Sequence, residues 1–264
     1  MRKYYTILTL LVLVLMAAPA LAQKVKLTWL GHAAFKVETP GGKVIYIDPW
    51  LKNPKAPPGA DRVERADLVL VTHGHFDHVG NTVDIVKATG AKLVANFDLG
   101  RALIVTGLPE GSLIGMNKGG TVAPLGPGIK ITMVRAEHSS GVSFTDPATG
   151  RPQTLYGGEA AGFIVALENG FTLYHAGDTD LFGDMRLIGE RYKLDLALLP
   201  IGGHFTMDPK GAAFAVDMLK PKAVVPMHYA TFPLIKGDPA EFQKALEGVP
   251  VRVIVMRPGE TLEF

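Results

Sequence analysis

The segment Thr72-His73-Gly74-His75-Phe76-Asp77-His78 places three histidines and one aspartate within a few residues of one another. It follows the apolar, β-branched run Leu68–Thr72, which predicts a strand buried on both faces. Open α/β sheets place their ligands just beyond such strands. Neutral imidazole and carboxylate groups are donors that suit zinc and similar divalent ions. The segment therefore predicts a metal site, and a solvated histidine-rich turn explains it poorly.

The spacing within this segment indicates how the donors divide. His73 and His75 are two residues apart, so in an extended segment their side chains point the same way. Asp77 and His78 lie past a bend, where they can face a second ion. Gly74 leaves room for close approach of the backbone. The chain contains no cysteine, which excludes disulfides, thiolate ligands and a cysteine nucleophile.

Alternating strand and helix patterns surround this segment and predict mixed sheets covered by helices. The Asn-Gly pair at Asn169-Gly170 is a strong hairpin signal. Asp208-Pro209 predicts a helix start, with Asp as the N-cap, and the helix is expected to run to about Lys220. A second helix is expected over Asn81–Thr89. The expected strands are Val25–Leu30, Ala34–Thr39, Val44–Ile47, Leu68–Thr72, Lys92–Ala95, Ile129–Arg135, Phe163–Leu167, Phe171–Tyr174, Leu196–Leu199 and Ala223–Pro226.

The two halves of the chain resemble each other. A hairpin followed by an aspartate occurs at Ala34–Asp48 and again at Gly162–Asp178. An Asp-led apolar strand then leads to His73 in the first half and to Gly202-Gly203-His204 in the second. This pattern predicts a two-fold internal pseudo-repeat with two sheets packed face to face, one per half. Coincidence between common α/β patterns remains the alternative.

The composition suits one large α/β domain or two small ones, because 264 residues with 47% hydrophobic side chains can bury a sizeable core. Residues 1–22 have a basic start, an apolar run and the small-residue site Ala20-Leu21-Ala22, which predict a signal peptide. The mature domain is then 23–264, exported to the periplasm or secreted, with no stable membrane insertion after cleavage. An uncleaved membrane anchor is the alternative.

Export would remove two basic residues and no acidic one, which leaves 25 of each. The mature net charge near zero argues against a nucleic-acid partner.

Beyond the first motif, three further segments carry a resemblance to a known family. His138 in Ala136–Ser140, Asp178 in His175–Thr179 and His228 in Pro226–Tyr229 follow in order. Together with the first motif they resemble the metallo-β-lactamase superfamily, which implies an α/β, four-layer αββα sandwich. Trp29–Phe35, Asp48-Pro49-Trp50 and Pro200–Met207 are similar to the branch of uncharacterised metal-dependent hydrolases near the ascorbate-6-phosphate lactonase-like proteins.

The resemblance implies a binuclear site with zinc, or alternatively manganese. His73, His75 and His138 would hold one ion, Asp77, His78 and His228 the other, and Asp178 would bridge them. A hydroxide held between the ions would attack a lactone, ester or amide carbonyl of a small-molecule substrate. A phosphodiesterase similar to phospholipase D and a non-catalytic metal-binding protein are the alternatives. A homo-oligomer also remains open.

Four other side chains are candidates near this site. Together with Asp77, His204 is assigned a catalytic role, since the pseudo-repeat is expected to bring it to the substrate; the alternative is a structural histidine before the Asp208 helix. His32 is expected either near the metals or in a structural hydrogen bond. His175 is interpreted as a core histidine, and Asp48 could orient a ligand histidine.

Overall fold

The computed structural model describes residues 24–264, so the expected signal segment lies outside the described residues. The first of two mixed sheets has seven strands in the order β16-β1-β2-β3-β4-β5-β6. Its strands are β1 (Lys26–Trp29), β2 (Phe35–Glu38), β3 (Val44–Ile47), β4 (Leu68–Leu70), β5 (Lys92–Asn96), β6 (Leu113–Met116) and β16 (Thr261–Glu263).

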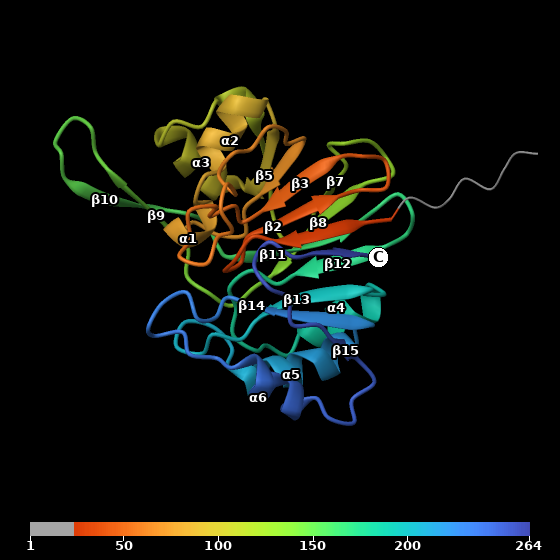
Figure 1. Cartoon of the computed structure of the whole chain (residues 1–264). Helices are drawn as coiled ribbons and strands as arrows, with labels where there is room; N and C mark the ends of the chain where they lie inside the picture. Colours follow the sequence, from red (N-terminus) through yellow and green to blue (C-terminus); the bar gives the residue numbers. More distant parts are fainter. Residues whose placement is uncertain (1–23) are drawn as a thin grey trace, which may run out of the picture.

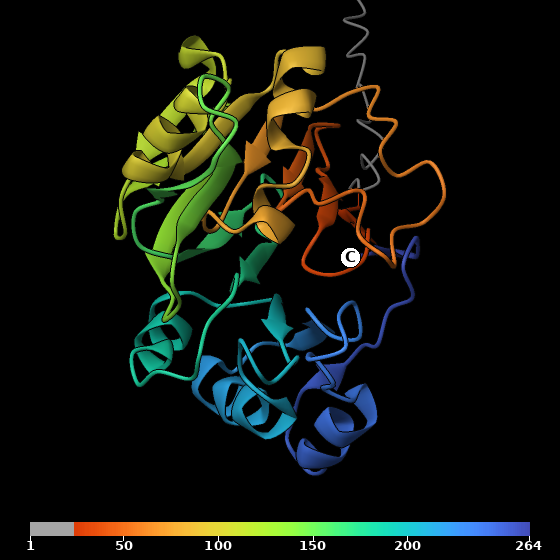
Figure 2. The same ribbon diagram turned by 90° about the vertical axis from the view of Figure 1, so that its left-hand side faces the viewer.

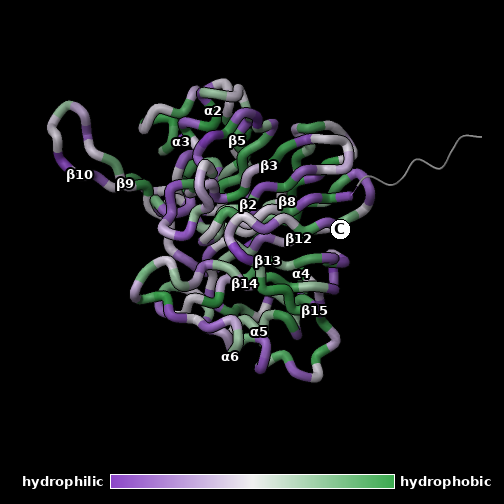
Figure 3. Tube along the Cα trace, in the orientation of Figure 1, coloured by the Kyte–Doolittle hydropathy of each residue, from purple (hydrophilic) through white to green (hydrophobic). Residues whose placement is uncertain are grey.

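The second sheet also has seven strands, in the order β15-β14-β13-β12-β11-β8-β7. Its strands are β7 (Thr121–Val122), β8 (Lys130–Arg135), β11 (Ala161–Ala166), β12 (Thr172–His175), β13 (Leu196–Pro200), β14 (Ala223–Met227) and β15 (Arg252–Val253). Strands β9 (Gly141–Thr145) and β10 (Pro152–Tyr156) pair only with each other. This hairpin projects from the body of the molecule, and β10 is largely hydrophilic (Figures 1 and 3).

Helices lie on the outer face of each sheet, at opposite ends of the molecule (Figures 1 and 2). The first half contributes α1 (Phe76–Val79), α2 (Thr82–Thr89), α3 (Phe97–Val105) and a 3₁₀ turn at Glu110–Ser112. The second half contributes α4 (Met185–Arg191), α5 (Pro209–Leu219) and α6 (Pro239–Ala245). Three apolar clusters occupy the three interfaces of this α/β, four-layer αββα sandwich, as expected.

The central strands show why the layers stack. In β4, Leu68 and Leu70 pack between the two sheets, whereas Val69 packs under the helices of the first half. In β13, Leu196 and Leu198 likewise pack between the sheets, and Ala197 packs under the helices of the second half. Both faces of each strand are apolar, so each strand can be buried only in a structure with a layer on either side.

The predicted pseudo-repeat is present in the strand topology. Each sheet has three antiparallel pairings followed by three parallel pairings. The Asp67 side chain accepts the Val44 N–H at 2.9 Å, and the Asp195 side chain accepts the Thr172 N–H at 2.8 Å. These two aspartates therefore have the same structural role, because each binds the first N–H of the neighbouring strand, β3 or β12.

The backbone pairing corrects one detail of the repeat. The Asp48 N–H donates to Leu70 O, and the equivalent bond in the second half runs from Ala176 to Leu198 O. Asp178, which the sequence pattern aligned with Asp48, thus lies two residues further along its loop.

The start of α5 is as predicted, because Asp208 Oδ1 accepts the Gly211 N–H at 2.7 Å and Pro209 is the first helical residue. Helix α2 confirms the helix expected over Asn81–Thr89, whereas helices α1, α3, α4 and α6 were not expected. Between residues 24 and 264, no helix is both long enough and apolar enough to cross a membrane.

Candidate metal centre

The predicted metal-binding residues meet at one edge of the sandwich, beyond the carboxyl ends of the central strands. Strand β4 leads into His73, and strand β14 ends one residue before His228. His138 follows β8, and Asp178 follows β12. Residues from both halves therefore converge because the two sheets present equivalent edges to the same place.

The turn after β4 is built for close packing. Residues 73–75 form the expected bend, His75 is the N-cap residue of α1, and Asp77 and His78 lie past this bend on a single helical turn. A Cβ atom on Gly74 would lie 2.9 Å from Val142 Cγ2, and one on Gly80 would lie 2.4 Å from Trp50 Cα. Glycine at these two positions lets the neighbouring backbone segments approach the turn.

Three histidines form the first group of donors. His73, His75 and His138 each offer a ring nitrogen, and these atoms lie within 4.8 Å of one another. His75 Nδ1 is 3.0 Å from His73 Nε2 and 3.3 Å from His138 Nε2. His73 is fully buried, whereas His75 and His138 are partly exposed. This group therefore borders solvent.

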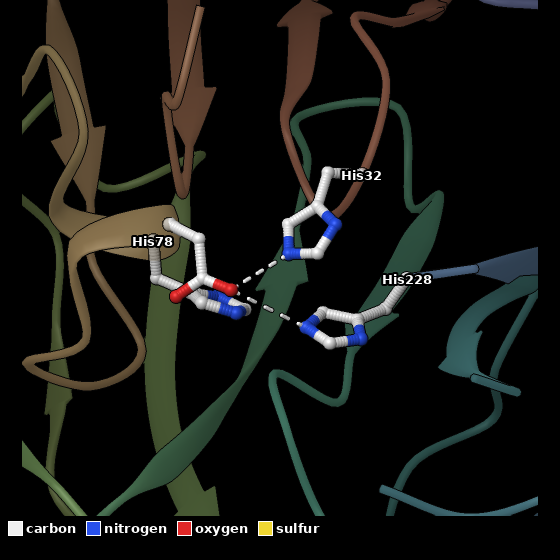
Figure 4. A group of neighbouring side chains, drawn as sticks. His32, His78 and His228 are labelled. Carbon is white, nitrogen blue, oxygen red and sulfur yellow. Dashed lines mark hydrogen bonds and ion pairs between the residues drawn. The ribbon is translucent and has the colours of Figure 1, made fainter. Parts of the chain in front are cut away.

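A second and deeper group contains Asp77, His78, His228 and also His32. His32 Nε2 lies 3.0 Å from Asp77 Oδ2, and His228 Nε2 lies 3.8 Å from the same oxygen. Figure 4 shows His32, His78 and His228 arranged around a shared carboxylate. The structure thus places His32 at the cluster, where the sequence left two alternatives open.

Asp178 lies between the two groups. Its Oδ1 is 3.3 Å from His78 Nε2, and its Oδ2 is 3.0 Å from His228 Nε2. The same Oδ2 is 3.6 Å from His138 Nε2 and 3.9 Å from His73 Nε2. One carboxylate therefore faces histidines of both groups, which is the position that a bridging ligand would need.

Asp48 orients histidines in both groups. Its Oδ2 accepts hydrogen bonds from His78 Nδ1 and from the Thr72 hydroxyl, both at 2.7 Å, and its Oδ1 accepts the Thr72 N–H at 2.8 Å. Because the Thr72 hydroxyl gives its only hydrogen to Asp48, His73 Nδ1 must donate to the Thr72 oxygen across 3.1 Å. His73 and His78 are therefore both protonated on Nδ1, which leaves each Nε2 lone pair directed into the cluster.

Several buried atoms in the cluster lack a hydrogen-bond partner. Within the described part of the chain they include His78 Nε2, Asp178 Oδ1 and both ring nitrogens of His228. A buried polar atom without a partner costs free energy, and it is rare in native proteins. A divalent cation is a partner that these nitrogen and oxygen donors would accept, so the residues present fit a metal site.

The electrostatics of the cluster agree with this fit. Burial lowers the pKa of His73, and the nearby His78 lowers it further, so this imidazole is held neutral. Burial alone would raise the pKa of Asp178, but His228 and His78 outweigh it and hold the carboxyl pKa well below its usual range. Burial alone would lower the pKa of His78, but the carboxylates of Asp178 and Asp48 outweigh it and raise this pKa. The position of His78 therefore favours a positive charge.

The backbone at the site is unusual as well. His32, Asp48 and His228 have φ angles of 56°, 47° and 56°, in the left-handed region that non-glycine residues seldom adopt. The N–H of His228 donates to the His32 carbonyl at 3.1 Å, which ties these two strained positions together across the halves. Such strain concentrates at functional sites.

A cavity of about 670 Å³ opens over the cluster. Its polar lining residues are His75, Asp77, His138, Ser139, Asp178 and His228. Its apolar lining residues are Phe76, Phe205, Phe232, Pro233 and Leu234. Five of the predicted metal-binding residues therefore face a space that a small molecule could enter.

The remaining candidates fall outside the cluster. His175 is fully buried, and its Nε2 donates to the Ala33 carbonyl at 3.0 Å, which is the structural role expected for it. His204 is exposed and stacks edge-on against Phe205, with ring centroids 4.4 Å apart. It does not line the cavity, whereas Phe205 does. The catalytic role predicted for His204 finds no support in this position.

His204 lies outside the cavity because of the register in which the two halves of the repeat align. Strand β13 continues to Pro200, and Ile201 is still backbone-paired to Met227. With Leu198 equivalent to Leu70, the position of His73 is taken by Ile201, so the loop that carries His204 begins later.

The four-layer sandwich and the histidine–aspartate cluster at its edge define the metallo-β-lactamase class of fold. The model of the Beta-lactamase superfamily domain matches residues 43–229. A UPF0173 metal-dependent hydrolase of Cupriavidus taiwanensis is 51% identical over 251 residues, which cover 92% of this chain and 88% of the relative. The chain belongs to this superfamily and is a metal-dependent hydrolase.

Other relatives agree with this assignment. A UPF0173 metal-dependent hydrolase of Anaeromyxobacter dehalogenans is 51% identical over 249 residues, covering 91% of this chain and 87% of the relative. The solved structure of Igni18, a metallo hydrolase from the archaeon Ignicoccus hospitalis, superimposes with a TM-score of 0.78 at 41% identity. That match covers 91% of this chain and 98% of Igni18.

Proposed function

We propose that this protein hydrolyses a lactone, ester or amide of a small molecule with the help of two divalent metal ions. The observation that carries the proposal is the position of Asp178, which faces two groups of donors at the floor of an apolar cavity. Zinc suits the imidazole-rich donor set best, and manganese is the alternative.

The donor groups suggest how the ions would be held. His73, His75 and His138 would bind the first ion, and Asp77, His78 and His228 the second, with Asp178 shared by both. His32 would act on the second ion through Asp77, because its Nε2 donates to the carboxylate and its Nδ1 hydrogen-bonds to the Thr231 hydroxyl. We assign His32 a positioning role.

When bound, the ions would lower the pKa of a water molecule and stabilise the negative charge that develops on the attacked oxygen. The chain would supply three further elements. Asp48 fixes the tautomers of His73 and His78, Asp178 holds negative charge between the two groups, and the apolar cavity wall excludes bulk water.

A hydrolysis screen tests this proposal. Zinc-loaded and manganese-loaded protein would be assayed against lactones, aryl esters, amides, bis(p-nitrophenyl) phosphate and β-lactams, with metal-depleted protein as the control. We expect turnover of a lactone, ester or amide that metal removal abolishes. Turnover of the phosphodiester alone would replace the proposal with the phosphodiesterase alternative. Metal binding with no turnover of any carbonyl substrate would contradict it.

We also propose that the protein acts outside the cytoplasm. The basic start, the apolar run and Ala20-Leu21-Ala22 support a signal peptide over residues 1–22 and a periplasmic or secreted mature chain from Gln23. Protease protection of the protein in intact cells, lost on outer-membrane permeabilisation, is the expected result for a periplasmic location.

A further inference from the structure

Apart from Ser139, the residues that line the cavity outside the proposed ligands are apolar. Three chain segments build this apolar wall, and each lies beside the site. Phe76 follows His75, Phe205 lies in the loop beyond β13, and Phe232–Leu234 follows His228 closely in sequence. The binding surface that a substrate would meet beyond the reacting centre is therefore aromatic and aliphatic.

Trp50 packs against two aromatic residues of this wall. Trp50 stacks on Phe232 with ring centroids 5.5 Å apart and 20° between the planes, and it meets Phe76 edge-on at 5.6 Å. Phe232 also meets the His32 ring edge-on at 5.5 Å. Because these contacts connect the wall to the cluster, the apolar surface has a fixed position relative to the donors.

The same wall leaves large apolar side chains open to solvent. Phe76 is 62% exposed, Phe205 is 49% exposed and Leu234 is 55% exposed. Contiguous exposed apolar side chains at a cavity mark a surface that is covered by a ligand in use.

Outside the proposed ligands, the described residues that line this cavity include no charged side chain. Among the residues that the structure describes, the cavity has no lysine, arginine, asparagine or glutamine in its wall. Ser139 is the one lining residue with a polar side chain outside the proposed ligand set, and its Oγ is 3.4 Å from His75 Nε2. A phosphate or carboxylate bound in this cavity would therefore find no lysine or arginine in its wall. Lys118 and Arg135 line a neighbouring cavity that also contains His138, and each is paired with a glutamate.

We propose that the substrate is an uncharged lactone or ester that carries an alkyl or aryl group, and that this group binds against Phe205, Phe232 and Leu234. This inference rests on the proposed function. The reaction is a balanced hydrolysis, in which the water oxygen bonds to the acyl carbon, the acyl carbon–oxygen bond breaks and a proton passes to the leaving oxygen. Hydrophobic burial of the side group supplies the affinity.

A series of γ-lactones that differ only in alkyl chain length, from γ-butyrolactone to γ-decalactone, tests the proposal on the metal-loaded protein. Burial of one methylene is worth about fourfold in affinity, so kcat/KM should rise by about that factor per methylene until the cavity is filled. The double variant Phe205→Ser, Leu234→Ser should flatten this dependence. Phe214→Ser is the matched control, because Phe214 on α5 is 66% exposed and does not line the cavity.

A binding measurement keeps the proposal testable without turnover. Alkyl hydroxamic acids of increasing chain length would be titrated into the metal-loaded protein by calorimetry. We expect affinity to rise with chain length in the wild-type protein and in Phe214→Ser, and to rise much less in the double variant.

Two results separate the inference from the proposed function. Equal kcat/KM for short and long lactones, or a preference for a carboxylate-bearing analogue, would overturn the apolar substrate class while leaving carbonyl hydrolysis intact. Failure to hydrolyse any lactone, ester or amide would overturn the proposed function, and hydroxamate affinities independent of chain length would then overturn the apolar site as well.

Discussion

Replacing Asp48 with asparagine should weaken metal binding at both donor groups, although Asp48 belongs to neither. The carboxylate is fully buried and accepts three hydrogen bonds, from the Thr72 N–H, the Thr72 hydroxyl and His78 Nδ1. In Asp48→Asn the amide oxygen must face the Thr72 N–H, so the NH₂ group faces the other two partners. The Thr72 hydroxyl would then donate to His73 Nδ1, and His78 Nδ1 would have to accept.

Both imidazoles would thereby move their proton to Nε2, the atom that faces the cluster. Loss of such an orienting partner typically costs tenfold to a hundredfold in metal affinity, or about 1.4 to 2.7 kcal/mol per site. Competition with a chromophoric zinc chelator would measure the affinity of each site. Unchanged affinity at both sites in a folded variant would refute this account of how Asp48 acts.

Asp195→Asn is the matched control for this experiment. Asp195 also accepts a backbone N–H and is partly buried, but it lies at the start of β13, at the opposite end of the strand from the metal cluster. We expect this variant to be less stable by about 1 to 2 kcal/mol and to keep its metal affinity. A fall in metal affinity as large as that of Asp48→Asn would show that the effect reports general destabilisation.

Three further predictions concern single positions. Asp178→Ala should abolish turnover in a folded protein, measured by circular dichroism and activity together, because the Asp178 oxygens lie close to histidines of both donor groups; retained activity would exclude Asp178 as the bridge. His204→Ala should leave the metal content unchanged and lower kcat by less than about tenfold, since His204 is exposed and outside the cavity; a fall of about a hundredfold or more would restore its catalytic role. Mass spectrometry of exported protein should give Gln23 as the first residue, and an intact Met1 in the membrane fraction would indicate an anchor.

The sequence located the metal cluster because its main signal is local. Four donors directly after a buried strand need little knowledge of the rest of the fold, and the other three donors were found through the family resemblance. His32 has no such signal. Its contact with Asp77 depends on a left-handed backbone conformation and on the packing of a loop from the first hairpin against the loop after His228.

Two helices were predicted and are present, α5 from its Asp-Pro start and α2 over Asn81–Thr89, whereas the other helices were missed. The Asp-Pro start that identified α5 also occurs at Asp238-Pro239, where Asp238 Oδ1 accepts the Ala240 N–H and begins α6. That helix could have been found from the same signal. Helix α3 could not, because Gly100 in its interior argues against a helix. The structure explains this glycine by packing, since a Cβ there would lie 2.3 Å from Leu113 Cδ1.

The hairpin β9–β10 was not predicted, because of the composition of its second strand and turn. Residues 145–158 are rich in glycine and proline, which favours a loop, yet β10 pairs along its whole length with β9. The prediction for His204 had a different origin. The sequence pattern aligns the strand aspartates Asp67 and Asp195 correctly, but at this register the counterpart of His75 is Gly203, and His204 corresponds to Phe76. The backbone hydrogen bonds of β12 and β13 give this register.

The number of zinc ions that one chain binds distinguishes a binuclear site from a site with a single ion. Purified protein spanning residues 23–264 would be stripped with chelator, replenished with zinc, freed of excess metal and analysed by inductively coupled plasma mass spectrometry. The two donor groups and the shared Asp178 predict close to two equivalents of zinc per chain. One equivalent or none under saturating metal would contradict the binuclear site.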